Sequence, residues 1–510
     1  MFARRFAAPV RFLLFTLAFG ISYALLPLYS WDQNTYFLHG LARAGYGLLR
    51  QDWLAGTTDP VPVFSLVVSL SYPISERLFY LYQFAILGVY LLGLTVIALK
   101  LFPVPTGART RVTFMVLVLA IHSSVGHAVS VKLLGFDALR PLHEGLAAHD
   151  VIGPVFQPSA FAAFLILSVA LFLSRRPILA VFSLGIAATV HPVYLLSGAA
   201  LTVGYVVSLY RDERKVRKPF VVGVVALALV LPIVIYVLRS FSATSDDLMA
   251  RALDILVNVR LPHHADPRVW FGAQSVVQVA LVVAGLLIAR RTRLFPIMLV
   301  TLLVGASLTL VQLLTGNLWL ALISPWRVSV VLVPTSTACV LAWLIERFSQ
   351  HLARHSALWL GATAALLAVL VIGGIVSMKR KFDARRNDPA TPMMMFVREA
   401  KSPREVYLIP VELQDFRLTT GAPTFVDFKS HPYRDREVVA WYDRVQAARL
   451  FFGVDTMDCA LLHELARQGG VTHVVSPAGR FGRSCEGLEA CYDDGRYIVY
   501  RLRNRLISHP

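Results

Sequence analysis

The segment VRFLLFTLAFGISYALLPLYSWDQNTY, residues 10–36, decides how the chain is organised. Residues 10–29 are predominantly apolar and long enough to cross the roughly 30 Å hydrocarbon core of a membrane. Arg4 and Arg5 precede this run as in a signal peptide, but no small-residue cleavage site follows it. We therefore predict an uncleaved first span, after which Trp31 and Asp32 mark the exit of the chain from the membrane.

Similar apolar runs recur as far as residue 377. Of the 510 residues, 56% are hydrophobic and 16% are charged, whereas soluble domains are roughly 45–50% apolar and about 25% charged. This composition excludes an ordinary soluble enzyme, a disordered chain and a fibrous repeat. We predict a polytopic α-helical membrane domain over residues 1–377, with 61–73 as a re-entrant or interfacial piece. The eleven expected spans are 10–29, 78–99, 112–128, 159–174, 177–190, 193–210, 219–238, 272–289, 294–313, 327–345 and 356–377.

The distribution of charge predicts the orientation. The net charge is +18, but the basic residues gather in alternate loops, which indicates a membrane protein and not a nucleic-acid partner. With a cytoplasmic N-terminus, the inside segments hold 18 basic and three acidic residues, and the outside segments before residue 378 hold 10 and 11. We therefore expect a multi-pass protein of a bacterial inner membrane with residues 378–510 on the periplasmic side. The basic run 379–386 directly after the last span is the one feature against this orientation.

Residues 378–510 have a more polar composition and predict a small extracytoplasmic α/β domain. The expected strands are 406–409, 424–428, 471–475 and 497–502, and the expected helices are 438–452 and 460–468. Two of Cys459, Cys485 and Cys491 could pair in an oxidising compartment. Cys485 and Cys491 are the nearest pair, but the sequence does not fix the pairing.

The long loops on the predicted outer side, 30–62, 129–158 and 239–271, are where we expect the function. In the first, polar residues recur every three or four positions from Asp32 to Arg50, which predicts one helix lying along the membrane surface. Asp32 could be the N-cap of this helix or a catalytic carboxylate. Gln33 and His39, which follow it, are candidate substrate contacts.

The second and third loops mix acids, bases and imidazoles, a combination that suits binding a lipid phosphate and handling a proton. A solvated loop with surface ion pairs is an equal alternative for the second loop. Arg327, at the head of a later span, could bind a phosphate or merely extend towards the interface. The candidate substrate-binding residues here are Lys132, Arg140, His143, Asp150, Arg260 and Arg327, with Glu144 as a second catalytic carboxylate.

The third loop also contains a weak metal signature. His263, His264 and Asp266 could ligate Zn²⁺ or Mn²⁺. Adjacent histidines rarely bind the same ion, so substrate hydrogen bonding and a structural turn remain open. The sequence has no P-loop, GxGxxG, GxSxG or HExxH motif, so a divalent metal ion is the only cofactor it suggests.

The arrangement of the whole chain resembles the GT-C superfamily of membrane glycosyltransferases, in a poorly characterised bacterial branch. The resemblance is carried by WDQNTYFLHGLARAGYGLLRQDWLAGTTDPVPVFS at 31–65, NVRLPHHADP at 258–267 and DFRLTTGAPTFVDFKSHPY at 415–433. It implies transfer of a hexose or pentose from a polyprenyl-phosphate-linked donor to a glycan, lipid or protein acceptor. Asp32 matches the first-loop acid, which activates the acceptor hydroxyl or helps to bind a metal, and Glu144 or Asp150 the second-loop acid. Gln33 replaces a second acid that many members have after the first.

Two other functions fit the same pattern. A non-enzymatic scaffold or subunit of a glycan-assembly complex could keep the fold without the chemistry. A transporter ranks third, because the sequence places few charges inside the spans and has no clear internal repeat.

Overall fold

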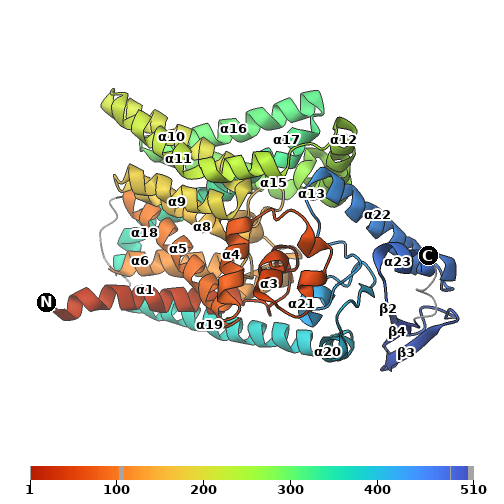
Figure 1. The fold of residues 1–510 in the computed structure, drawn as a ribbon. Helices are drawn as coiled ribbons and strands as arrows, with labels where there is room; N and C mark the ends of the chain where they lie inside the picture. The colour runs from red at the N-terminus through yellow and green to blue at the C-terminus, as the bar shows by residue number, and fades with distance from the viewer. Residues whose placement is uncertain (1, 103–107, 355, 483, 504–510) are drawn as a thin grey trace. The chain divides into compact units, whose positions relative to one another are not determined.

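The computed structural model describes residues 2–102, 108–354, 356–482 and 484–503 (Figure 1). The chain divides into two compact units that interleave along the sequence. The first, here called the helical unit, contains residues 1–26, 79–238 and 256–380. The second, here called the mixed unit, contains residues 27–78, 239–255 and 381–510.

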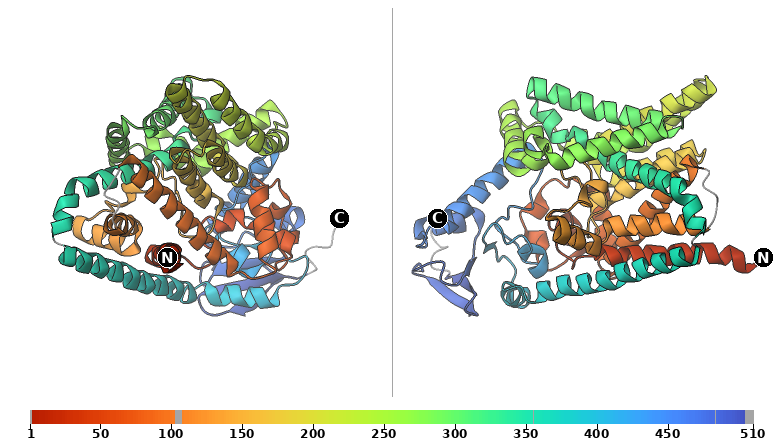
Figure 2. Two further views of the ribbon diagram at one scale, coloured as in Figure 1. Left: turned by 90° about the vertical axis from the view of Figure 1, so that its left-hand side faces the viewer. Right: turned by 180° about the vertical axis from the view of Figure 1, so that it is seen from behind.

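The helical unit is built from apolar helices that run side by side (Figures 1 and 2). Its longer helices are α1 (Phe2–Tyr23), α5 (Leu78–Leu101), α6 (Ala108–His122), α7 (Ser124–Leu134), α8 (Ala162–Leu173), α9 (Pro177–Val190), α10 (Leu195–Glu213), α11 (Arg217–Ser240), α15 (Ala273–Ala289), α16 (Leu294–Thr315), α18 (Ser329–Arg354) and α19 (Ser356–Arg386). Its shorter pieces are η3 (Arg140–Leu142), η4 (Pro158–Phe161), η5 (Pro192–Tyr194), η6 (Ile255–Arg260), α13 (Pro262–Ala265), α14 (Pro267–Trp270), α17 (Leu318–Ile323) and η7 (Pro325–Val328).

The predicted helical membrane domain is confirmed, but the count of eleven spans is not. Among the described residues, six helices are long and apolar enough to cross a membrane, and a seventh span is formed if α6 and α7, bent by 62°, count as one. The four remaining predicted runs coincide with apolar helices of only 10–17 residues. Prolines and polar loops end these helices early, so hydropathy alone overestimates how far each one extends.

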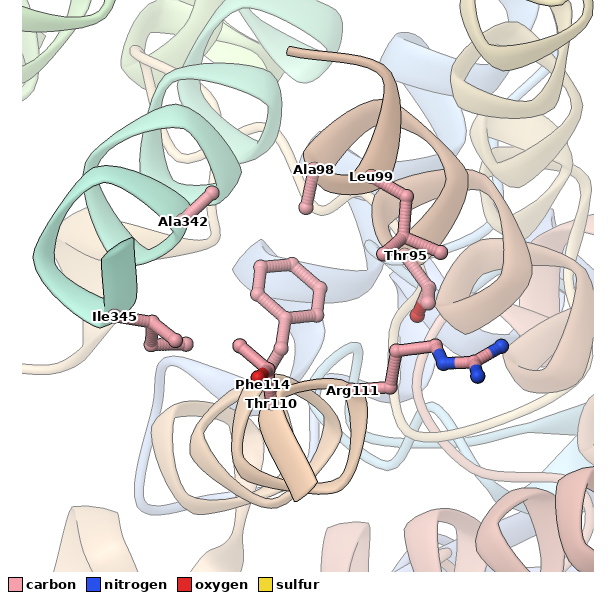
Figure 3. Close-up of a pocket in the computed structure, with 8 residues that line it drawn as sticks. All are labelled: Thr95, Ala98, Leu99, Thr110, Arg111, Phe114, Ala342 and Ile345. Atoms are coloured by element: carbon pink, nitrogen blue, oxygen red, sulfur yellow. The ribbon is translucent and has the colours of Figure 1, made fainter. Parts of the chain in front are cut away.

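Small residues let the helices of this unit approach closely. A Cβ on Gly204 of α10 would lie 2.8 Å from the Cα of Ile297 in α16, and one on Gly285 of α15 would meet Ser336 of α18 at similar distances. Helices in membranes associate through such close backbone packing, since lipid offers no hydrophobic drive. A largely apolar pocket lies between α5, α6 and α18, and the Phe114 ring of α6 points into it (Figure 3).

The mixed unit combines helices with a four-stranded sheet. Its sheet order is β1-β2-β4-β3, with β1 and β2 parallel and the other pairs antiparallel. Its helices are α2 (Gln33–Tyr36), α3 (Leu38–Ala44), η1 (Leu49–Gln51), η2 (Leu54–Gly56), α4 (Pro62–Ser71), α12 (Asp246–Asp254), α20 (Thr391–Ala400), α21 (Phe416–Thr420), α22 (Asp435–Phe452) and α23 (Cys459–Gly469). Its strands are β1 (Tyr407–Leu408), β2 (His473–Pro477), β3 (Leu488–Asp493) and β4 (Tyr497–Leu502).

The first loop of the chain packs directly into this unit. The backbone N–H of Leu48 donates to the carbonyl of Gly421 at 2.7 Å, and the Tyr46 hydroxyl donates to the Leu418 carbonyl at 2.9 Å. A Cβ on Gly47 would lie 2.4 Å from the same Gly421 oxygen, so only glycine permits this contact. The prediction of one continuous surface helix is wrong, because Gly45 and Gly47 both adopt positive φ and end α3.

One further expectation for residues 378–510 needs correction. Residues 424–428 are not a strand beyond one bridge between Thr424 and Tyr407, and the Thr424 N–H donates to the Asp52 carboxylate. The disulfide, whose partners the sequence left open, joins Cys459 to Cys485 and ties the start of α23 to the segment before β3. The other predicted strands and both predicted helices are present, within a few residues of their expected ends.

Candidate active site

Asp32 stands at the start of α2, but its side chain does not cap that helix. Its carboxylate instead accepts a charge-assisted hydrogen bond from the Lys429 ammonium, with Oδ1 2.5 Å from Nζ. Both side chains are about one quarter exposed, at 29% and 26%. This acid is therefore directed towards a cation and solvent, where it can act on a bound molecule.

Sequence reasoning missed Lys429 as a site residue, although it lies in the DFKSHPY segment. The structure fixes its backbone from several sides. The Thr35 hydroxyl donates to the Lys429 carbonyl at 3.2 Å, and the neighbouring Ser430 hydroxyl donates to the Asn34 carbonyl at 2.9 Å. These bonds join the turn around residue 430 to α2, so Asp32 and Lys429 are positioned together.

A buried ion network lies under this turn. Arg417 is 2% exposed and donates through Nε to Asp52 at 2.9 Å and through Nη1 to Asp427. Asp427 in turn accepts from the Ser430 N–H at 2.6 Å, next to Lys429. Burial raises the pKa of Asp427, and the Arg417 guanidinium opposes that shift. Arg417 and Asp427 are therefore an internal support for the Asp32 site.

A second set of polar groups flanks Asp32. The Asn34 side-chain amide donates to Asp415 Oδ1 at 2.5 Å, and Asp415 also pairs with Arg385. The Asn34 Oδ1 atom is buried and has no hydrogen-bond partner among the described residues. The Asn34 side chain therefore serves mainly to join α2 to Asp415.

Gln33 and His39, the other candidates of the first loop, bond to the protein backbone. Gln33 is 1% exposed, and its Oε1 accepts from the Tyr29 N–H at 2.8 Å. The Nε2 atom of His39 lies 3.1 Å from the Thr57 carbonyl, and burial lowers the pKa of His39. Both side chains therefore hold the loop in shape.

In the helical unit, Glu144 lies in the segment between α7 and α8. Arg140 donates through Nε to Glu144 Oε2 at 2.6 Å, and Gln278 of α15 holds the Glu144 carbonyl at 2.9 Å. Burial and the charge of Asp150 raise the pKa of Glu144 to about 7, against the opposing effect of Arg140. A carboxyl group with this pKa can gain and lose a proton at neutral pH.

The raised pKa of Glu144 predicts a pH dependence. Because its folded pKa, about 7, lies above the usual value near 4.5, the protonated form predominates below pH 7. Activity that needs the carboxylate should then fall as the pH drops through 7. We expect kcat/KM to show this inflection, Glu144→Gln to remove it, and Arg140→Gln to move it to higher pH. An unchanged profile in Glu144→Gln would assign the inflection to another group.

A second cluster of the helical unit combines an arginine with imidazoles. His149 is 2% exposed, and neither ring nitrogen has a hydrogen-bond partner among the described residues. Its ring centroid lies 4.6 Å from that of His264, whose Nδ1 bonds to the Ala147 carbonyl at 2.7 Å. Burial and the charge of Arg327 lower the pKa of His149, and the pKa of His264 falls to about 3. The cluster therefore offers neutral imidazoles beside a permanent cation.

The remaining predicted residues have different surroundings. Lys132 lies on an exposed part of α7, and Arg260 ends η6, where its charge contributes to lowering the pKa of His264. His143 is 7% exposed and contacts other histidines of its unit. The Asp266 carboxylate caps α14 by accepting from the Arg268 N–H at 2.9 Å.

The expected metal ligands do not assemble into a three-ligand site. His264 uses Nδ1 for a backbone carbonyl, and the Asp266 carboxylate caps a helix. Within the described residues, no three His, Cys, Asp or Glu side chains could hold a metal ion together. Metal dependence stays a prediction.

Comparisons with known proteins bear on the fold. A family model described as a domain of unknown function, DUF6798, matches residues 389–448, a range that includes Arg417 and Lys429. Comparison with curated proteins gives no match.

Several solved structures are similar to the chain. ArnT from Cupriavidus metallidurans bound to undecaprenyl phosphate is 14% identical, with a TM-score of 0.55 over 98% of this chain and 99% of ArnT. The apo state of ArnT is 13% identical, with a TM-score of 0.53 over 99% and 100%. An Archaeoglobus fulgidus oligosaccharyltransferase complex with Zn and sulfate is 12% identical, with a TM-score of 0.45 over 98% of this chain and 74% of that one. The two ArnT matches cover nearly both whole chains and show that this protein has the GT-C fold.

Proposed function

We propose that the protein is a membrane glycosyltransferase that moves a sugar from a polyprenyl-phosphate-linked donor to an acceptor outside the cytoplasm. The observation that carries this proposal is the Asp32 carboxylate, which does not cap its helix and lies 2.5 Å from the Lys429 ammonium in a protein with the GT-C fold. The ArnT structure with bound undecaprenyl phosphate supports the class of donor.

In this mechanism Asp32 acts as the general base. The carboxylate takes the proton of the acceptor hydroxyl as the oxygen attacks the anomeric carbon, and the bond between that carbon and the lipid phosphate breaks. The Lys429 ammonium holds the Asp32 carboxylate in position through a charge-assisted hydrogen bond.

The helical unit by itself contains a cluster that suits a phosphate group. Arg327 with His149 and His264 offers one cation and imidazoles of low pKa. Arginine recognises phosphate oxygens by planar, paired hydrogen bonds, and a neutral imidazole can donate one more. Glu144, with a pKa of about 7, is the second carboxyl group we assign to proton handling.

A non-enzymatic scaffold is the second candidate function. The observation that favours it is the closed Asp32–Lys429 pair, since an ion pair of this kind can simply tie α2 to residues 427–433. A scaffold would require the Asp32–Lys429 pair for its structure, but it would not require the Asp32 carboxylate to act as a base.

A profile of lipid-linked sugars and surface glycans tests the two functions. We would compare a deletion strain, the deletion with the wild-type gene, and the deletion with Asp32→Asn at equal protein level. Loss of one glycosylated species that only the wild type restores would support the transferase and identify its product. Full restoration by Asp32→Asn would rule out Asp32 as the base, and no change in any strain would favour the scaffold.

Lys429 should matter for transfer and not for folding. Because Lys429→Ala removes the cation beside Asp32, we expect kcat to fall roughly 10- to 100-fold, below the full effect of losing a general base. Lys429→Arg should retain most of the activity. The measurement is kcat and KM in detergent or nanodiscs, with Lys401→Ala, a half-buried lysine of the same unit that donates to the Arg398 carbonyl, as control. Equal activity of Lys429→Ala and wild type would contradict this role.

We further propose a cytoplasmic N-terminus and an extracytoplasmic mixed unit. The excess of basic residues in alternate loops supports this orientation, and so does the Cys459–Cys485 disulfide, since disulfides persist in oxidising compartments. Protease added to intact spheroplasts should remove a tag placed after residue 510. Protection of that tag would reverse the orientation.

A further inference from the structure

A chain of acid and imidazole groups in the helical unit is not used by the mechanism above. Asp137 accepts from His127 Nδ1 at 2.7–2.8 Å, and His127 Nε2 lies 3.1 Å from His143 Nε2. The chain runs from the loop after α7, through α7, to the segment after η3. Three consecutive groups are thus in hydrogen-bond contact, and each can carry a proton.

The hydrogen-bond partners fix the direction of this chain. A carboxylate only accepts, so Nδ1 of His127 carries a proton, and in the neutral form of this ring Nε2 is the acceptor. Nε2 of His143 must then be the donor to His127, which leaves Nδ1 of His143 with its lone pair. Both hydrogen bonds of the chain therefore have the same donor-to-acceptor direction, which leads from the acceptor nitrogen of His143 to the carboxylate of Asp137.

The side chains become steadily less buried along the chain from His143 through His127 to Asp137. His143 is 7% exposed, whereas the His127 and Asp137 side chains are 23% and 28% exposed. Behind His143 lies His122, 3% exposed, with ring centroids 4.6 Å apart. His122 is itself held by the Val118 carbonyl at 2.8 Å and the Tyr90 hydroxyl at 3.1 Å. His122 and Tyr90 thus position the His143 ring at the buried end.

We propose that His143, His127 and Asp137 form a proton relay that leads from a buried acceptor nitrogen to a partly exposed carboxylate. The proposal rests on the proposed function, in which Glu144, the residue after His143, is assigned to proton handling. When a proton binds His143 Nδ1, the proton on His143 Nε2 passes to His127 Nε2, and the proton on His127 Nδ1 passes to Asp137. One proton enters, one reaches the carboxyl group, and each ring stays neutral.

The alternative is that Asp137 has only a structural role. Its contacts show how an experiment can distinguish that role from proton transfer. Asp137 Oδ1 also accepts from the N–H groups of Leu139 and Arg140, at 3.2 and 3.3 Å. Asparagine retains an oxygen for these turn bonds but cannot take a proton. Asp137→Asn therefore keeps the turn and breaks the relay. The other charged groups near the relay are Arg140 and Glu144, which pair with each other at 2.6 Å.

The first test is spectroscopic and needs no substrate. In wild-type protein labelled with nitrogen-15 histidine in nanodiscs, we expect His127 to carry its proton on Nδ1 and to be coupled to His143. His127→Gln should change the His143 resonances, and Asp137→Asn should remove the preference of His127 for Nδ1. His463→Gln, an exposed histidine of the mixed unit, is the control. An Nε2-protonated His127 in the wild type would overturn the relay.

The second test is kinetic. We expect Asp137→Asn and His127→Gln each to lower kcat roughly 100-fold, the lower end of the range for proton-transfer catalysis, with KM unchanged. The solvent deuterium isotope effect on kcat should rise in both variants, and imidazole should partly rescue His127→Ala. Normal kcat and isotope effect in Asp137→Asn would refute the relay. If the spectra behave as expected while wild type shows no transfer, the proposed function fails and the proton path stands.

Discussion

Replacing Asp32 with asparagine should lower kcat for sugar transfer by about 10²- to 10⁴-fold, the range attributed to a positioned general base. Asparagine is nearly the same size and can still accept a hydrogen bond from Lys429, so the turn around residue 430 should keep its shape. Since the side chain does not cap α2, the helix loses no capping bond. The measurement is single-turnover transfer from a polyprenyl-phosphate sugar by purified protein.

The matched control for this experiment is Asp455→Asn. Asp455 lies in the same unit with a side chain that is 98% exposed, so its loss removes a charge without touching the site. Thermal unfolding of both variants should match the wild type. Transfer by Asp32→Asn at more than half the wild-type rate would show that the carboxylate only anchors Lys429.

Replacing Arg417 with methionine should have the largest effect on stability. The change leaves the buried carboxylates of Asp52 and Asp427 without their cation, and breaking a buried ion pair costs about 3–5 kcal/mol. We expect the mixed unit to unfold at lower temperature and residues 381–510 to become sensitive to protease. The measurement is limited proteolysis against temperature, together with denaturant unfolding in detergent.

Two further variants give this prediction its controls. Arg501→Met removes an arginine that is about half exposed and should change stability little. Adding Asp52→Asn and Asp427→Asn to Arg417→Met should recover part of the loss, because the unpaired charges are removed as well. No recovery in the triple variant would mean that Arg417 acts by packing and not by charge.

Much of the helical unit follows from sequence because long apolar runs have few alternatives in a membrane. Hydropathy could not predict the length of each helix. The helices Pro158–Leu173 and Pro177–Val190, for example, are shorter than a membrane span. In the mixed unit, α22 and α23 followed from their periodicity. The strand β3, with the pattern LEACYD and a bulge near Ala490, had no clear alternation to reveal it.

The candidate site was predictable only in part. Asp32 stands out because it follows the first apolar run, but Lys429 lies 397 residues further along the chain. No local pattern links the two, and only the folded mixed unit brings them together. Arg417 and Asp427 lie in the same 415–433 segment as Lys429, and their burial makes them a support of the site. Such long-range pairs are set by tertiary packing, which a single sequence does not display.

The interleaving of the two units has a consequence for biosynthesis. Asp52 cannot form its ion pair until Arg417, which is 365 residues later in the chain, has been synthesised. At about 5–20 residues per second, translation separates the two by roughly 20–70 s. During that interval every helix before α19 is inserted while the Asp52 segment stays hydrated and without its permanent partner. Completion of the mixed unit is therefore a late step, and a ribosome that stalls before residue 417 releases a chain whose first loop quality-control proteases can still recognise.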